Sequence, residues 1–228
     1  MLTRVDGRLA GASLVGFAGM FFTNMLLTNT PDIDKTNAQA VDFFTVAANR
    51  TQAIVAFYVL VAAAACLIGV LVTLLPPARA RGRDGVVSAA WTCGSAFIGL
   101  YLAGGAAFLL PTATVALNFA HGPIDPVFAR TMSTWGDGLL LIAAPVALAA
   151  CLAFSCRAAH TTGAMPGWLV YSGYAVAVCL LLAGWTWFPL PLTVLWALIA
   201  GLRLLIRPQR VAKQADQTGT DRAVTSRA

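Results

Sequence analysis

The sequence predicts an all-α fold: an integral membrane six-helix bundle with both the N-terminus and the C-terminus in the cytoplasm. Hydrophobic residues make up 59% of the chain, charged residues only 11%, and the hydrophobic residues gather in six long stretches. A soluble domain usually carries about 25% charged residues, so a fully water-covered surface is excluded. A bilayer core about 30 Å thick needs roughly 20 apolar helical residues. The six stretches are residues 9–28, 51–75, 86–110, 135–156, 166–187 and 190–206.

These stretches are predicted to be helices and not barrel strands. Backbone polar groups in lipid must be paired, and in a helix they are paired within the segment. Barrel strands would show blocks of about ten residues with alternating hydrophobicity. The six apolar runs are continuous instead.

The positions of the cations give the orientation, because short loops rich in Lys and Arg stay in the cytoplasm. With the N-terminus inside, 12 of the 15 Lys and Arg residues lie on the inner side. The outer side then holds only Lys35, Arg50 and Arg130. The reverse topology is therefore rejected.

The first stretch resembles a secretory signal, because Arg4 and Arg8 precede an apolar run. The run is long, however, and bulky residues occupy 20–24, where a small-residue cleavage site would be expected. We therefore expect an uncleaved helix. Small residues that allow close helix approach occur at Gly7, Gly11, Gly16 and Gly19.

The segment before the second stretch predicts a short amphipathic helix at about 37–49, lying across the outer surface. Thr36 followed by Gln39 matches a capping box, and apolar residues then recur at three- and four-residue spacing. One uninterrupted helix through 36–75 would be about 58 Å long. We therefore expect a break near Asn49 and Arg50. The short helix would either cap a cavity or rest on the interface.

Prolines mark the ends and bends of the next helices. Pro76 and Pro77 are expected to stop the second helix, and Pro111 and Pro145 to bend the third and fourth. Small residues predict helix contacts in the third stretch, and the alternative is a dimer face. They are Ser95, Gly99, Ala103, Gly104 and Gly105.

The fourth helix is expected to begin ahead of its apolar stretch. Asp125 suits the N-cap and Pro126 the first turn, so the helix would enter the membrane near Trp135. The last two helices are joined by a tight turn around Phe188 and Pro189, so they are predicted to be antiparallel neighbours.

Neither a metal nor a cofactor is predicted. The five cysteines fall within apolar stretches without zinc-ligand spacing and suit a packing role. His121 and His160 are predicted to lie on opposite sides of the membrane, so they cannot share a metal. No catalytic residues are assigned.

The candidate functional site is a polar pocket open to the outside. Charged and amide side chains within membrane stretches are costly and often functional. Here they gather at the predicted outer ends of the helices, and Asp137 is the only carboxylate within a stretch. The alternative is a hydrated interfacial carboxylate. The five candidates are Asn24, Arg50, Gln52, Arg130 and Asp137.

The net charge of +6 is read as a topology signal and not as a nucleic-acid interface. Residues 207–228 are polar and slightly basic, which predicts a disordered cytoplasmic tail. Contact with anionic lipid is possible for Arg203, Arg207, Arg210 and Lys213.

Several short motifs resemble a large family of uncharacterised bacterial multi-pass membrane proteins, a domain-of-unknown-function family. The matching segments are Phe43-Phe44 before Asn49-Arg50, Gly163-Ala164-Met165-Pro166-Gly167-Trp168-Leu169, Leu195-Trp196 and Gly201-Leu202-Arg203-Leu204. The resemblance implies a six-helix bundle in the bacterial plasma membrane and no known activity.

Three functions follow in order of preference. The first is a non-enzymatic accessory or structural membrane component, with a homo-oligomer or another membrane protein as partner. The second is a binder or transporter of a small apolar or amphipathic molecule that enters the outward pocket. The third is a membrane enzyme, which would need several titratable groups converging on one site.

Overall fold

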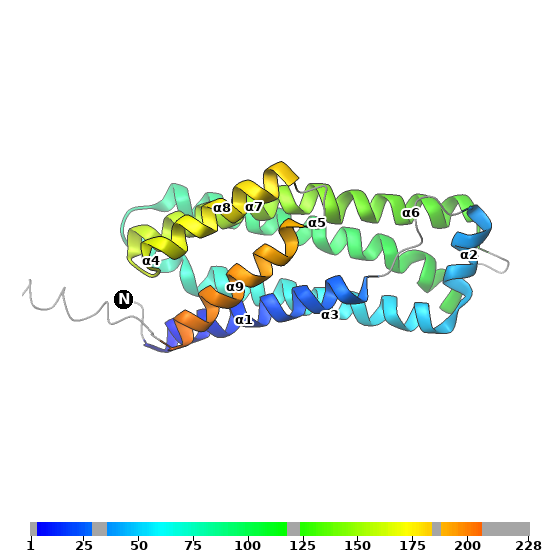
Figure 1. The fold of residues 1–228 in the computed structure, drawn as a ribbon, viewed down its shortest axis with the longest axis horizontal. Helices are drawn as coiled ribbons and strands as arrows, with labels where there is room; N and C mark the ends of the chain where they lie inside the picture. The colour runs from blue at the N-terminus through cyan, green and yellow to red at the C-terminus, as the bar shows by residue number, and fades with distance from the viewer. Residues whose placement is uncertain (1–3, 29–35, 118–123, 184–187, 207–228) are drawn as a thin grey trace, which may run out of the picture.

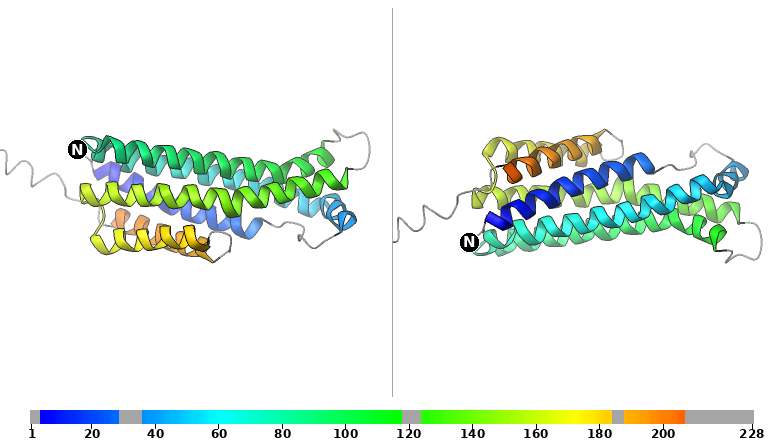
Figure 2. Two further views of the ribbon diagram at one scale, coloured as in Figure 1. Left: turned by 90° about the horizontal axis from the view of Figure 1, so that it is seen from above. Right: turned by 90° about the horizontal axis from the view of Figure 1, so that it is seen from below.

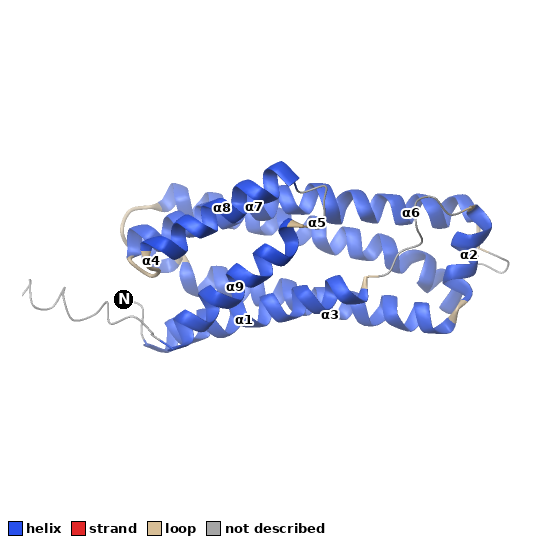
Figure 3. Ribbon diagram, viewed as in Figure 1, coloured by secondary structure: helices blue, strands red, loops and turns tan. Residues whose placement is uncertain are grey.

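The computed structural model describes residues 4–28, 36–117, 124–183 and 188–206, and nearly all of them are helical (Figure 3). The all-α prediction is confirmed for this part of the chain. The helices are α1(Arg4–Leu27), α2(Asn37–Thr45), α3(Ala47–Leu74), α4(Pro76–Arg79), α5(Asp84–Ala116), α6(Pro126–Gly138), the π-helical segment η1(Leu139–Ala143), α7(Ala144–Thr162), α8(Gly167–Ala183) and α9(Pro189–Ile206).

Within the described ranges, five helical stretches are long and apolar enough to cross a membrane. They are Gly7–Leu27, Ala47–Arg79, Asp84–Ala116, Pro126–Thr162 and Pro189–Ile206. The stretch Gly167–Leu182 is apolar but shorter than these. The predicted tail at 207–228 and most of the turn before Pro189 lie outside the described residues.

The long helices form a closed ring in which each packs against the next. The order around the ring is α1, α3, α5, α7, α8, α9 and back to α1. Helices α8 and α9 are antiparallel neighbours, as the tight turn predicts (Figure 1). Most of the large apolar side chains that the ring buries form one core cluster.

The helices differ in length, and this gives the molecule two unlike ends. At 1.5 Å per residue, Ala47–Arg79 and Asp84–Ala116 are each about 50 Å long, whereas the 17 described residues of α8 span about 26 Å. Figure 2 shows α8 and α9 alongside only the half of the bundle nearer the N-terminus. The N-terminal end holds the start of α1, helix α4 and the end of α9, and α2 crosses the opposite end, the distal tip (Figure 1).

The capping box at the start of α2 is confirmed. The Gln39 amide N–H donates to the Thr36 Oγ1 at 3.4 Å, and the Thr36 amide N–H donates to the Gln39 Oε1 at 3.0 Å. Helix α2 ends at Thr45, and Val46 is extended with φ −73° and ψ 120°. The chain therefore breaks at Val46, ahead of the predicted position near Asn49.

Helix α2 closes the distal tip through a small apolar cluster. Phe44, Ile124 and Ala129 are buried together, with Phe43 and Phe128 packed beside them. These residues come from α2, the segment before α6, and α6 itself. The tip therefore has its own core beyond the ends of α1, α8 and α9.

The fourth predicted helix begins as expected. The Asp125 Oδ1 accepts from the Val127 amide N–H at 2.9 Å, and Pro126 is the first helical residue. Helix α6 then continues without interruption through η1 into α7. At the end of η1, the Ala144 N–H bonds the Leu139 carbonyl five residues back. Pro145 follows, and it lacks the amide N–H that would bond a carbonyl in the preceding turn. The preceding turn is accordingly widened into a π-helical turn.

Pro76 and Pro77 follow the end of α3, as predicted, and Pro111 lies within α5. Helix α3 ends at Leu74. After the single residue Leu75, the chain forms one more helical turn, α4. Prolines are tolerated in a first helical turn, where an amide donor has no helical partner. Pro111 lies inside α5, which continues for five more residues.

Glycines set the closest helix approaches. A Cβ on Gly11 would lie 2.8 Å from the carbonyl oxygen of Gly201, and a Cβ on Gly201 would lie 2.9 Å from that of Gly11. Helices α1 and α9 therefore cross almost backbone to backbone. Gly104 and Gly105 similarly face leucines of η1 and α3. Nothing lies within 4 Å of a Cβ built on Gly99, so this part of α5 is open.

Candidate functional site

Asn24 is the centre of a buried polar node that joins three helices. Its side chain is only 4% exposed. The Asn24 Nδ2 donates to the Ala56 carbonyl on α3 at 2.9 Å, and the Asn24 Oδ1 accepts from the Tyr101 hydroxyl on α5 at 2.8 Å. Buried polar groups without partners are costly in an apolar medium, so this pairing satisfies both side chains.

Aromatic rings enclose the node on the side towards the N-terminal end of the bundle. The Tyr101 ring stacks on Phe97 at 5.1 Å between centroids and on Phe21 at 5.4 Å. Phe17 meets Phe97 edge-on at 6.4 Å. Tyr101 is not among the five predicted site residues. The signal that could have found it is a tyrosine in the middle of an apolar stretch, away from the interfacial positions that tyrosine prefers.

A small cavity lies beside the node on the side towards the distal tip. Its volume is about 30 Å³, and Asn24, Thr28, Phe57, Phe108 and Leu140 are among the lining residues. A water needs roughly 10–15 Å³ measured in this way, so the space suits about two waters. Of the five predicted site residues, Asn24 alone lines this cavity among the described residues.

Two other predicted site residues hold backbone segments together. The Gln52 Nε2 donates to the Leu27 carbonyl at 2.9 Å, which ties the start of α3 to the end of α1. An Arg50 guanidinium nitrogen donates to the carbonyls of Thr45 at 2.6 Å and Phe44 at 3.3 Å. Arg50 thus caps the C-terminal end of α2, where carbonyls lack helical partners.

Replacing Arg50 with alanine is expected to loosen α2 and leave the ring helices intact. The last carbonyls of α2 lose two charge-assisted hydrogen bonds, so amides of Asn37–Thr45 should exchange about fivefold to tenfold faster. Hydrogen exchange followed by mass spectrometry measures this. Arg81→Ala, which removes an exposed cation at the N-terminal end of the bundle, is the control, and equal exchange in both variants would contradict the capping role.

Asp137 and Arg130 lie on α6, away from the Asn24 node. Asp137 is half-buried, one helical turn outward of Leu140, and Arg130 is exposed. The structure therefore does not gather the five residues into one pocket. Asn24 and Gln52 link the end of α1 to α3, Arg50 caps α2, and the two charged residues of α6 are near the distal tip.

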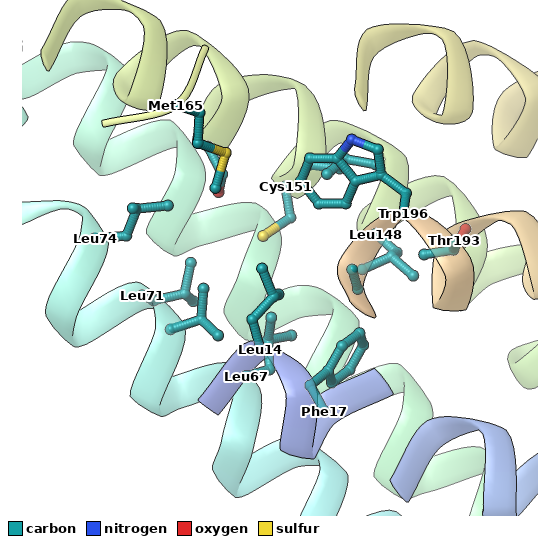
Figure 4. A pocket seen from close by; sticks show the side chains of 14 residues that line it. Leu14, Phe17, Leu67, Leu71, Leu74, Leu148, Cys151, Met165, Thr193 and Trp196 are labelled. Carbon is teal, nitrogen blue, oxygen red and sulfur yellow. The ribbon is translucent and has the colours of Figure 1, made fainter. Parts of the chain in front are cut away.

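A second cavity occupies the centre of the ring in its N-terminal half (Figure 4). Its volume is about 40 Å³, and side chains of α1, α3, α7 and α9 line it together with Met165. Leu14, Leu71 and Cys151 point into it, and Trp196 forms part of its wall (Figure 4). The Thr193 hydroxyl donates a hydrogen bond to the Pro189 carbonyl at 3.0 Å. A cavity this apolar is expected to stay dry.

Metal-binding groups do not gather in the described part of the chain, where no three His, Cys, Asp or Glu side chains come together. No family model, curated protein or solved structure matches this chain.

Proposed function

We propose that the chain is a six-helix multi-pass protein of the bacterial plasma membrane that acts without catalysis, as an accessory component associating with other membrane helices. Helix α8 supplies the sixth span in this proposal. Both termini are assigned to the cytoplasm. The family resemblance in the sequence remains an expectation.

The distribution of cations supports this orientation. Arg8, Arg79 and Arg157 lie towards the N-terminal end of the bundle, together with Arg81, Arg83 and Arg203. The distal tip carries Arg50 and Arg130. Because cytoplasmic loops carry the excess of Lys and Arg, the N-terminal end is placed in the cytoplasm and the distal tip outside.

The observation that carries the accessory role is a bare stripe of small residues on α5. Ser95, Gly99 and Ala103 follow each other at four-residue spacing, and all three are exposed. Ser88, Thr92 and Ala96 extend the same exposed surface towards the N-terminal end. Small residues at this spacing let two membrane helices approach closely and associate by van der Waals packing.

The use of the buried polar groups favours the same role. Asn24, Tyr101 and Gln52 form hydrogen bonds between helices. The Trp196 Nε1 also donates to the Leu169 carbonyl at 3.0 Å, joining α9 to α8. These groups stabilise the bundle and do not converge on a common reacting position.

Replacing Gly99 with leucine is expected to weaken self-association about tenfold, which corresponds to about 1.4 kcal/mol. The leucine side chain fills the open stripe, so a facing helix can no longer approach closely. Counting photobleaching steps of labelled protein in liposomes, over a series of protein-to-lipid ratios, measures the dimer fraction.

Ala65→Leu is the matched control, because Ala65 is an exposed small residue on α3 outside the stripe. It should leave the dimer fraction unchanged. A wild-type protein that stays monomeric at the highest ratio, and that co-purifies with no membrane protein sensitive to Gly99→Leu, would refute the proposal.

Binding of a small amphipathic molecule is the second candidate function. The half-polar cavity beside Asn24 favours it, because the cavity reaches the outer end of α1. Its volume of about 30 Å³ suits water better than an organic molecule. This function therefore ranks below helix association, and a membrane enzyme remains third.

A further inference from the structure

The hairpin of α7 and α8 carries a compact group of basic and aromatic side chains near the N-terminal end of the bundle. Arg157 and His160 lie three residues apart on α7, and Tyr171 and Tyr174 lie three residues apart on α8. Three of the four are exposed, and Tyr174 is partly exposed. We call these four residues the hairpin cluster.

The two helices pair these side chains in two rows. The Arg157 guanidinium interacts with the phenol of Tyr174. One turn further along α7, the His160 ring lies 6.2 Å from the Tyr171 ring, with 55° between their planes. Each row therefore sets a nitrogen group of α7 beside a phenol of α8.

The hairpin holds these rows firmly. Helix α7 ends at Thr162, Gly163 caps it with φ 67°, and the Ala164 N–H donates to the Ala159 carbonyl at 2.9 Å. This arrangement satisfies carbonyls at the end of the helix and reverses the chain within a few residues. Further along, Gly173 meets Cys156 so closely that any side chain at Gly173 would clash.

The acidic residues of the chain all lie outside the segment that carries the cluster. Residues 139–206 contain neither Asp nor Glu. At the same end of the bundle, Asp84 is already paired with Arg79 at 3.3 Å. A negatively charged partner for Arg157 must therefore come from outside residues 139–206.

The cluster also lies at a suitable depth. Arg157 is five residues before the end of α7, which is about 8 Å along the helix axis. Trp168, at the start of α8, is 57% exposed. Tryptophan favours the headgroup level of a membrane, and an arginine about one turn deeper can extend its side chain to that level.

We propose that the hairpin cluster binds the phosphate of an anionic phospholipid in the inner leaflet. Arg157 pairs with the phosphate oxygens, and the Tyr174 hydroxyl, held beside it, donates a further hydrogen bond. His160 and Tyr171 complete the polar rim. The planar fork of an arginine suits phosphate recognition, and charge-assisted bonds to phosphate are strong. This site is separate from the stripe on α5 and from Arg203.

Native mass spectrometry tests the proposal with purified full-length protein in a mild detergent. Phosphatidylglycerol and phosphatidylcholine with identical acyl chains are titrated in parallel, so that only the headgroups differ. The wild type should retain one phosphatidylglycerol in clear preference to phosphatidylcholine. Arg157→Ala should weaken that first binding step about fivefold.

Two further variants separate a built site from general surface charge. Tyr174→Phe removes a hydroxyl without changing the charge, and it should weaken binding about twofold to threefold. Arg83→Ala removes an exposed cation at the same end of the bundle and should have no effect. If Arg157→Ala does not fold, Tyr174→Phe alone decides.

Equal retention of the two lipids by the wild type would overturn the proposal. So would an Arg83→Ala loss as large as that of Arg157→Ala, because binding would then reflect overall charge. Self-association does not enter this measurement, since monomers and dimers are resolved by mass. The lipid site and the α5 stripe can therefore fail independently.

Discussion

Alanine at Gly11 is expected to lower the free energy of unfolding by about 1–3 kcal/mol, the usual cost of overpacking. The new Cβ would lie 2.8 Å from the Gly201 carbonyl oxygen and 2.9 Å from the Leu205 amide nitrogen. Both atoms belong to the backbone of α9, so the clash is relieved only if the whole helix moves. Unfolding in mixed micelles titrated with sodium dodecyl sulfate measures the change.

Gly19→Ala provides the control on the same helix, because nothing lies within 4 Å of its Cβ. Alanine is a better helix former than glycine by about 1 kcal/mol, so this variant should be neutral or slightly more stable. If Gly11→Ala were as stable as Gly19→Ala, the close crossing of α1 and α9 would be contradicted.

Leucine at Asn24 is expected to lower the free energy of unfolding by about 1–3 kcal/mol, because the buried Tyr101 hydroxyl loses its acceptor. Tyr101→Phe should cost less, about 1 kcal/mol, since the Asn24 amide keeps its bond to the Ala56 carbonyl. The double variant should lose less than the sum of the two, because both polar partners are then gone.

A double-mutant cycle gives the coupling between Asn24 and Tyr101. Hydrogen bonds between membrane helices average about 0.6 kcal/mol and reach about 1.7 kcal/mol, and a value in this range is expected. Thr28→Val is the control, because the Thr28 hydroxyl donates to the backbone carbonyl of Asn24 and not to its side chain. Strictly additive losses in the double variant would show that the two side chains do not interact.

Local signals in the sequence predicted helix starts better than the break after α2. The Thr36 capping box and the Asp125 cap depend on neighbouring residues, and both are present. The break lies at Val46, ahead of Asn49 and Arg50, because these two side chains reach back to carbonyls at the end of α2. The Asn49 side-chain amide donates to the Phe43 carbonyl at 2.9 Å, and the Arg50 guanidinium donates to the carbonyls of Phe44 and Thr45. Asn49 and Arg50 are therefore the residues that cap α2, and the bend itself lies before them.

The candidate site was predictable only in part, for a related reason. Sequence composition identified Asn24 as a costly polar group, but its partner Tyr101 is 77 residues away. Residue spacing along one helix carries no information about such a contact. Hydropathy also gives no measure of how far helices continue beyond the bilayer, so it could not place Arg50 and Arg130 near a projecting tip.

The short pair of helices on one side of the ring has a consequence for the surrounding lipid. The described part of α8 spans about 26 Å and that of α9 about 27 Å, whereas a typical hydrocarbon core is about 30 Å and α5 is far longer. In the proposed six-span arrangement the two flanks of the bundle therefore present different hydrophobic lengths to the lipid, and mismatch costs fractions of a kcal/mol per ångström. Lipid is expected to thin beside α8 and α9 only, and this one-sided deformation favours thin bilayers and neighbours that deform lipid in the same way.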